Sequence, residues 1–152
     1  MSKRFLFICL SAVVPLLAGC TSQNAELPDP SELYAAIADA AELPEMYRIP
    51  QELISDYYGI EPDWYISIVA YKCQDILRPD EIVIVKAVSE KAAEDVMARL
   101  EAWMAYKEKS AENYFSETVS SIHNGVIRQD GLTVSLLVAS DIDSVINVFD
   151  SL

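Results

Sequence analysis

The stretch Glu81-Ile82-Val83-Ile84-Val85-Lys86-Ala87-Val88 decides the fold, because its concentration of β-branched residues predicts a β-strand. A loop over residues 74–79 separates it from an earlier run, Trp64–Cys73, that is rich in aromatic and β-branched residues. That run also alternates, which predicts a second strand that pairs antiparallel with the first. The alternation places Trp64, Ile66, Ile68 and Ala70 on one face, and Tyr65, Ser67, Val69 and Tyr71 on the other.

A second pair of strands is predicted near the C-terminus. The apolar runs Val126–Arg128 and Leu132–Ala139 flank Gln129-Asp130-Gly131. Asp-Gly between two apolar runs is a strong local signal for a β-hairpin. We therefore expect these two runs to form the third and fourth strands.

Helix signals surround the strands. Asp29-Pro30-Ser31-Glu32 is a helix start, with an acidic cap and proline at the first helical position. A short helix is predicted over about 50–58, ending at Gly59. Ser89 caps the longest helix, and Ser140 is the expected cap of the last one, which opens with Ser140-Asp141-Ile142-Asp143. Residues 110–121 fit either a short helix or an irregular packed segment.

Together these elements predict an α+β fold in a single domain over residues 31–152. The expected architecture is a four-stranded antiparallel sheet in ββαββα order, with two helices packed on one face. The additional N-terminal helices are expected at an edge or an end of this sheet. The other face is too apolar to be simply solvated, so the N-terminal helices, a second subunit or a ligand should cover it. We expect Tyr65 and Tyr71 to belong to a binding face there.

The N-terminus predicts export. Lys3 and Arg4 precede the apolar run 5–18, which suits a signal peptide over residues 1–19 better than a membrane-spanning helix. The run ends in Leu17-Ala18-Gly19-Cys20, which resembles the bacterial lipobox. That resemblance implies cleavage between Gly19 and Cys20 and a diacylglycerol group on Cys20. A plain signal peptide or a short anchor helix are the alternatives.

The expected location is the extracytoplasmic face of the cell membrane. Residues 20–30 contain turn formers without periodicity and read as a short tether behind the lipid anchor. The chain carries 24 acidic and 11 basic residues, a formal net charge of −13. Such a charge is repelled by phosphate backbones, so no nucleic-acid partner is expected.

Few residues suggest chemistry. Once Cys9 is removed with the signal peptide and Cys20 is lipidated, Cys73 is the remaining cysteine, and His123 is the single histidine. Cys73 fits a buried apolar position or a nucleophile, and His123 fits a surface loop. The adjacent acids Asp80 and Glu81 fit a solvated turn better than a cation site or an acid–base pair. No cofactor motif and no metal-ligand spacing is present, so neither cofactor nor metal is expected.

The sequence also resembles a known family. Leu43-Pro44-Glu45-Met46, Tyr58-Gly59-Ile60, the Asp80–Ala87 strand and the Gly131 hairpin resemble a family of clostridial lipoproteins built on a domain of unknown function. The resemblance spans roughly Leu33 to the C-terminus. It implies a single-domain, lipid-anchored envelope protein of a Gram-positive bacterium, without an established catalytic residue.

Two functions follow as hypotheses. The favoured one is a non-enzymatic, lipid-anchored accessory or binding module, whose partner is an envelope protein or a second copy of the chain. The alternative is a small envelope enzyme that uses Cys73 or His123 with carboxylates. The poverty of catalytic residue types favours the first.

Overall fold

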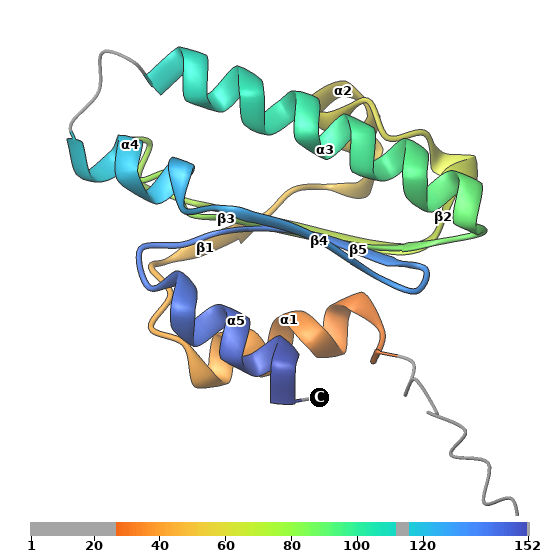
Figure 1. Ribbon diagram of the computed structural model, residues 1–152, viewed down its shortest axis with the longest axis horizontal. Coiled ribbons are helices and arrows are strands. Elements are labelled where there is room, and N and C mark those ends of the chain that lie inside the picture. The colour runs from red at the N-terminus through yellow and green to blue at the C-terminus, as the bar shows by residue number, and fades with distance from the viewer. Residues whose placement is uncertain (1–26, 112–115, 152) are drawn as a thin grey trace, which may run out of the picture.

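The computed structural model describes residues 27–111 and 116–151 (Figure 1). The predicted signal peptide 1–19, which ends at Gly19, lies outside the described residues, as do Cys20 and the rest of the tether before Leu27. Between the helices and strands lie two 3₁₀ helices, Gln51–Leu53 and Pro62–Trp64. The helices and strands are α1 (Pro30–Ala40), β1 (Met46–Arg48), α2 (Ile54–Tyr58), β2 (Tyr65–Cys73), β3 (Glu81–Ala87), α3 (Glu90–Ala111), α4 (Ser116–His123), β4 (Val126–Asp130), β5 (Thr133–Val138) and α5 (Ile142–Ser151).

The sheet has five antiparallel strands in the order β1-β2-β3-β5-β4. The four predicted strands are present, and β2 pairs with β3 as expected. The prediction of a four-stranded sheet is nevertheless wrong, because β1 adds a strand at the edge beside β2. This strand has only three residues, Met46, Tyr47 and Arg48, which is too short to show an alternation in the sequence.

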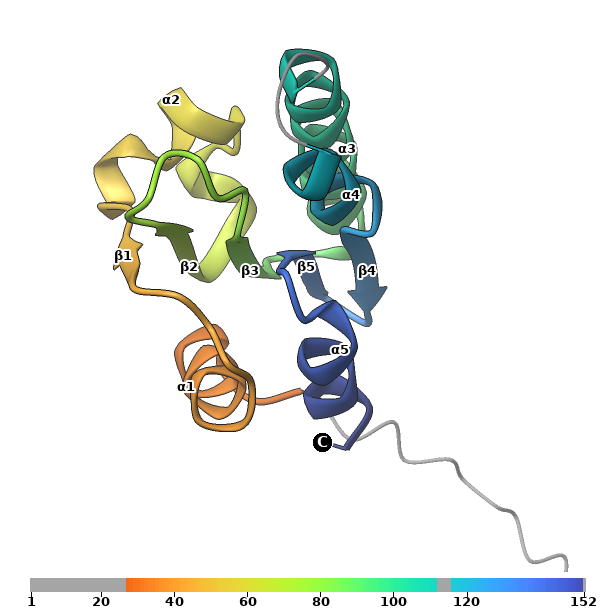
Figure 2. The same cartoon turned by 90° about the vertical axis from the view of Figure 1, so that its left-hand side faces the viewer.

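Helices cover both faces of the sheet, so the prediction of two helices packed on one face is also wrong. Figure 2 shows α2, α3 and α4 on one side of the strands and α1 and α5 on the other. The reason lies in β3, where Ile82 and Ile84 pack in the core beneath α1 and α5, whereas Val83 and Val85 pack beneath α3. A strand that is apolar on both sides needs cover on both sides. The helix α4 between α3 and β4 also departs from a simple ββαββα order.

A β-bulge near the start of β2 changes which side chains share a face. The register shifts between Tyr65 and Ser67, so Ile66 is the extra residue, and it is 64% exposed. Tyr65 consequently joins the core beneath α3, whereas Tyr71 packs with the core beneath α1. The expectation that Tyr65 and Tyr71 lie on one face is therefore wrong.

The helix ends explain how α1 and α5 are placed. The Asp29 carboxylate accepts a hydrogen bond of 3.0 Å from the amide of Ser31, which confirms the predicted cap. Its other oxygen accepts from the Ser67 hydroxyl at 2.9 Å, which joins the start of α1 to β2. At α5 the cap is Asp141, which accepts from Ser144, instead of Ser140.

Candidate functional site

Glu81, the first residue of β3, is completely buried, although the sequence suggested a solvated turn. Its carboxylate accepts a hydrogen bond of 2.6 Å from the hydroxyl of Tyr58. The indole nitrogen of Trp103 lies 3.2 Å from both carboxylate oxygens. The ammonium of Lys107 forms an ion pair with the same group. The interpretation of Asp80 and Glu81 as a solvated turn is therefore wrong.

Three donors compensate for burying this charge. Burying a carboxylate without partners would lower the stability of the fold by roughly several kcal/mol, so these hydrogen bonds offset the cost of burying Glu81. Burial raises the pKa of the Tyr58 hydroxyl, and the nearby charge of Glu81 raises it further. Tyr58 therefore keeps its proton and acts as a donor. The result is that α2 and α3 are both fixed to the start of β3.

Asp80 is buried as well, in a separate set of contacts. It is 2% exposed and forms an ion pair with Arg78 at 3.1 Å. It also accepts hydrogen bonds from the backbone amide of Ser140 at 3.1 Å and from the Ser140 hydroxyl at 3.3 Å. Asp80 therefore ties the loop before β3 to the residues that follow β5, which explains why Ser140 does not cap α5.

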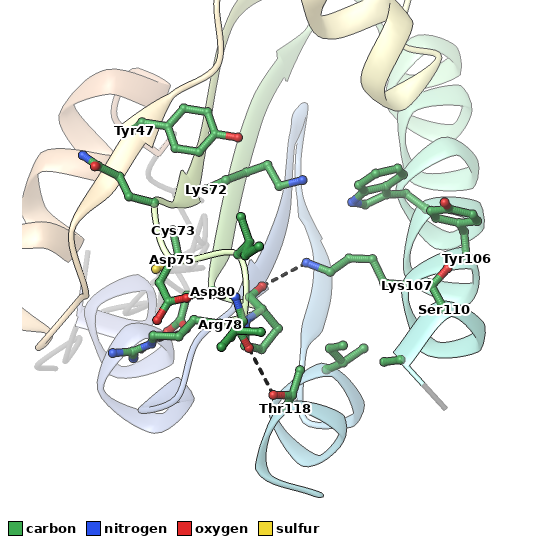
Figure 3. A pocket seen from close by; sticks show the side chains of 17 residues that line it. Tyr47, Lys72, Cys73, Asp75, Arg78, Asp80, Tyr106, Lys107, Ser110 and Thr118 are labelled. Carbon is green, nitrogen blue, oxygen red and sulfur yellow. Dashed lines mark hydrogen bonds and ion pairs between the residues drawn. The ribbon is translucent and has the colours of Figure 1, made fainter. Parts of the chain in front are cut away.

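A pocket of about 310 Å³ lies beside these two acids (Figure 3). Its walls come from the ends of β1 and β2, the loop that leads from β2 to β3, the last turns of α3, and α4. Its lining includes three basic residues, two acidic residues, three aromatic residues and the apolar residues of the loop. They are Lys72, Arg78 and Lys107; Asp75 and Asp80; Tyr47, Trp103 and Tyr106; and Ile76, Leu77 and Pro79.

Hydrogen bonds hold the walls of the pocket together. Lys107 donates to the backbone carbonyl of Pro79 at 2.9 Å, and Thr118 on α4 donates to the carbonyl of Leu77 at 3.2 Å. Both bonds, shown dashed in Figure 3, connect the loop to helices across the pocket. The pocket is thus a defined feature of the fold, which is typical of ligand sites.

Lys72 occupies a special place in this pocket. Its ammonium lies 5.3 Å from the ring centre of Trp103 and 5.5 Å from that of Tyr57, within range for cation–π contacts. Trp103 in turn stacks on Tyr106, with ring centres 5.5 Å apart. In Figure 3, Lys72 extends from β2 and Lys107 from α3, and their ammonium groups both point into the space between these elements.

The predicted catalytic candidates, Cys73 and His123, are not brought together. Cys73 is a buried free thiol that lines the pocket. His123 does not line it, and its Nδ1 lies 3.5 Å from a carboxylate oxygen of Glu108 on α3. Within residues 27–111 and 116–151, no hydrogen bond joins Cys73 to a histidine or a carboxylate side chain.

The two tyrosines of the predicted binding face make contacts within the chain. Tyr65 is 8% exposed, and its hydroxyl accepts a weak hydrogen bond from Gln51 at 3.4 Å. Tyr71 stacks face to face on Tyr34 of α1, with ring centres 3.5 Å apart. The sheet face that carries Tyr71 is covered by the N-terminal helix α1, one of the expected covers, together with α5.

Sequence reasoning missed the residues around Glu81. The charged run Lys107-Glu108-Lys109 predicts a solvated helix end, but the side chain of Lys107 is only 12% exposed. Trp103 and Lys107 stand four residues apart on α3, which places them on the same face of the helix. That spacing is the one signal that could have shown Lys107 facing the sheet.

The described part of the chain contains neither a group of metal-binding side chains nor a membrane-spanning helix. No group of three His, Cys, Asp or Glu side chains among the described residues could hold a metal ion. No helix among them combines the length and the apolar character needed to cross a membrane.

One comparison with known proteins gives a result. A family model described as a domain of unknown function, DUF4358, matches residues 39–139. This range includes all five strands and every element that lines the pocket. No curated protein and no solved structure matches the chain at a significant level.

Proposed function

We propose that this chain, which belongs to the DUF4358 family of domains of unknown function, is a non-enzymatic binding module. Its ligand site is the pocket between the loop at residues 74–79 and the end of α3. Cys20 carries a lipid that holds the module on the outer face of the cell membrane.

The observation that carries this proposal is the fixed wall of the pocket. Glu81 holds Trp103 and Lys107 in place through hydrogen bonds that are closed to solvent. Lys107 also holds the loop through the carbonyl of Pro79. A site whose side chains are already ordered loses less entropy when a ligand binds, which favours affinity.

The contacts of Cys73 favour binding over catalysis. A cysteine nucleophile is normally activated by a base within hydrogen-bond reach. Cys73 lines the pocket, but His123 contacts Glu108 instead. The competing function, an envelope enzyme that uses Cys73 or His123 with carboxylates, would need a rearrangement to bring a base to Cys73, and the pair of His123 and Glu108 does not line the pocket.

The anchor rests on the sequence Leu17-Ala18-Gly19-Cys20 and on the preceding apolar run. A diacylglycerol group supplies two acyl chains, which is sufficient for stable attachment to a membrane. From Cys20 to Asp29 the chain reaches at most ~30 Å when it is extended. The module would therefore work close to the bilayer, on a ligand or a partner of the cell envelope.

A ligand screen tests the proposal. The full chain, purified in a non-ionic detergent, is screened for compounds that raise its melting temperature. Each active compound is then tested on Tyr106→Ala, at the rim of the pocket, and on the control Ile66→Ala. Both residues are similarly exposed, 61% and 64%, but Ile66 lies near the start of β2, away from the pocket.

The expected result is a stabilisation that Tyr106→Ala loses and Ile66→Ala keeps, with the compound recovered unchanged by mass spectrometry. Equal responses of the two variants would contradict the assignment of the pocket. Recovery of a chemically altered compound would contradict the non-enzymatic function and support the enzyme.

A further inference from the structure

We infer that the pocket binds a small organic carboxylate with a flat apolar body, and that the ammonium of Lys72 binds the carboxylate group. This inference rests on the proposed binding function and names the ligand class. It follows from the charges, the aromatic surfaces and the size of the pocket.

The basic side chains of the pocket differ in whether an acidic side chain pairs with them. Of its three basic side chains, Arg78 pairs with Asp80 and Lys107 pairs with Glu81. Lys72 makes only cation–π contacts, and no carboxylate of the described residues lies within ion-pair distance of it. In a chain with 24 acidic and 11 basic residues, a lysine that faces a pocket without an acidic partner is unexpected.

The acidic side chains in and beside the pocket make hydrogen bonds or ion pairs within the chain. Asp75 accepts a hydrogen bond of 2.9 Å from the backbone amide of Leu77 within its own loop. Asp80 accepts from Arg78 and Ser140, and Glu81 is buried behind the wall. Asp75 keeps its charge within the loop, so the attraction for an anion is local and centres on the ammonium of Lys72.

Lys72 and Lys107 have N–H donors that are free to bind such an anion. A lysine ammonium has three N–H donors, and those of Lys72 have no hydrogen-bond acceptor among the described residues. Lys107 uses two of its donors on Glu81 and the carbonyl of Pro79, which leaves one. Figure 3 shows both ammonium groups pointing into the space between β2 and α3, so donors from both elements face a ligand that enters there.

The number of available donors in the pocket favours a carboxylate over a phosphate. A phosphate monoester carries about −1.5 to −2 charges at neutral pH and is usually bound by several donors, often including arginine. Here the guanidinium of Arg78 is engaged by Asp80, and the buried charge of Glu81 lies beside Lys107. A single unpaired ammonium with one further donor fits a singly charged carboxylate better.

The aromatic and apolar walls of the pocket indicate the shape of the rest of the ligand. Trp103 and Tyr106 form a stacked pair, and Tyr47 lies on the opposite wall. Beside them Ile76 is 90% exposed and Leu77 is 54% exposed. These surfaces suit a flat apolar body, and about 310 Å³ lies at the small end of ligand pockets. An aromatic acid combines these properties.

The test uses benzoate as the probe, with three compounds of similar size or charge for comparison. Benzamide keeps the shape without the charge, benzylamine reverses the charge, and inorganic phosphate removes the ring. The sequence contains two tryptophans, Trp64 and Trp103, so in the full chain with Trp64→Phe the fluorescence reports on Trp103 alone. Each probe is titrated into this protein in a non-ionic detergent.

We expect benzoate to change the Trp103 fluorescence in a saturable way, and the other three probes to have little effect. Lys72→Met should raise the benzoate dissociation constant about tenfold or more, since it removes a charge-assisted hydrogen bond. Lys91→Met, which removes an exposed lysine at the other end of α3, should leave the dissociation constant unchanged. Circular dichroism verifies that both variants are folded.

Binding of benzamide as tight as that of benzoate, or unchanged affinity in folded Lys72→Met, would overturn the carboxylate assignment. Saturable binding of phosphate or benzylamine in place of benzoate would also overturn it, while the pocket would stay a binding site. No response to benzoate overturns the ligand class as well. The binding module itself fails separately, if the broader screen with Tyr106→Ala and Ile66→Ala identifies no ligand of the pocket.

Discussion

Lys107 on α3 and Glu81 on β3 form an ion pair that is almost closed to solvent, with side-chain exposures of 12% and 0%. Removing one member of such a pair leaves the other charge buried without compensation. Glu81→Gln should therefore lower the free energy of unfolding by about 3 kcal/mol or more, measured by urea denaturation.

Two variants serve as controls for this prediction. Asp95→Asn breaks the Lys91–Asp95 pair on the exposed face of the same helix and should change stability far less. Glu81→Gln combined with Lys107→Met should cost less than the two single changes together, because no unpaired charge is left. Equal losses in Glu81→Gln and Asp95→Asn would contradict the structural role of the pair.

The Tyr58 hydroxyl gives a second prediction. It donates to the buried Glu81 carboxylate at 2.6 Å, and Tyr58 is 4% exposed. Tyr58→Phe should lower the free energy of unfolding by about 1.5 to 3 kcal/mol, the range for a hydrogen bond to a charged group. The neighbouring change Tyr57→Phe, at a ring that is 39% exposed, should have little effect. A loss of similar size in both variants would argue against the hydrogen bond.

A third prediction concerns pH. Hydrogen bonds from Ser31, first from its backbone amide and then from its hydroxyl, hold the pKa of Asp29 below its ordinary value of 3.8. Because the pKa is lower in the folded state, the stabilisation is present above 3.8 and is lost as the pH falls through the folded-state value.

The variant Asp29→Asn keeps a capping side chain but does not titrate. The stability difference between the native chain and this variant should therefore shrink on acidification, when urea denaturation is compared at neutral pH and below 3.8. A difference that stays constant with pH would refute the contribution of the carboxylate.

The hairpin between β4 and β5 gives a fourth prediction. Gly131 has φ of 59° and an added Cβ would meet nothing within 4 Å, so the cost of a side chain comes from the backbone alone. Gly131→Ala should lower stability by about 1 kcal/mol, and Gly131→Asn by less, since asparagine tolerates this conformation better. Melting temperatures of the two variants test this order. A melting temperature of Gly131→Asn equal to or lower than that of Gly131→Ala would contradict the explanation.

Lipid anchoring gives a fifth prediction. Cys20→Ala should shift the protein out of the membrane fraction of cells, because the acyl chains have no other attachment point in the proposal. Cys73→Ala should leave it in that fraction. Equal membrane retention of both variants, measured by fractionation and immunoblotting, would contradict the lipobox interpretation.

The sequence predicted those parts of the fold that follow from local patterns. The β-branched run 81–88 and the Asp-Gly turn identify strands because their geometry depends on neighbouring residues. The cap at Asp29 and the left-handed Gly59, with φ of 66°, follow from similarly local signals. Face assignments in β2 failed, because one bulged residue, Ile66, reverses the alternation and leaves no mark in the sequence.

The site could not be predicted in the same way. Two adjacent acids before a strand are usually solvated, and the partners of Glu81 lie 22 to 26 residues away along the chain. Only the packing of α2 and α3 against the sheet brings those partners to it. Lys72 could not be predicted from the sequence either, because its lack of an acidic partner follows only from the positions of the surrounding charged side chains.

The hydrogen bond between Asp29 and Ser67 also places the start of α1 away from the pocket. Ser67 lies near the start of β2, whereas Cys73, at the far end of the strand, lines the pocket. The strand between them spans roughly 20 Å, and Figure 1 shows α1 beginning at the end of the sheet opposite α4. If Cys20 carries the proposed lipid, the anchored segment would join the domain at the end of the sheet away from the pocket, so the anchor itself would not obstruct the mouth of the pocket.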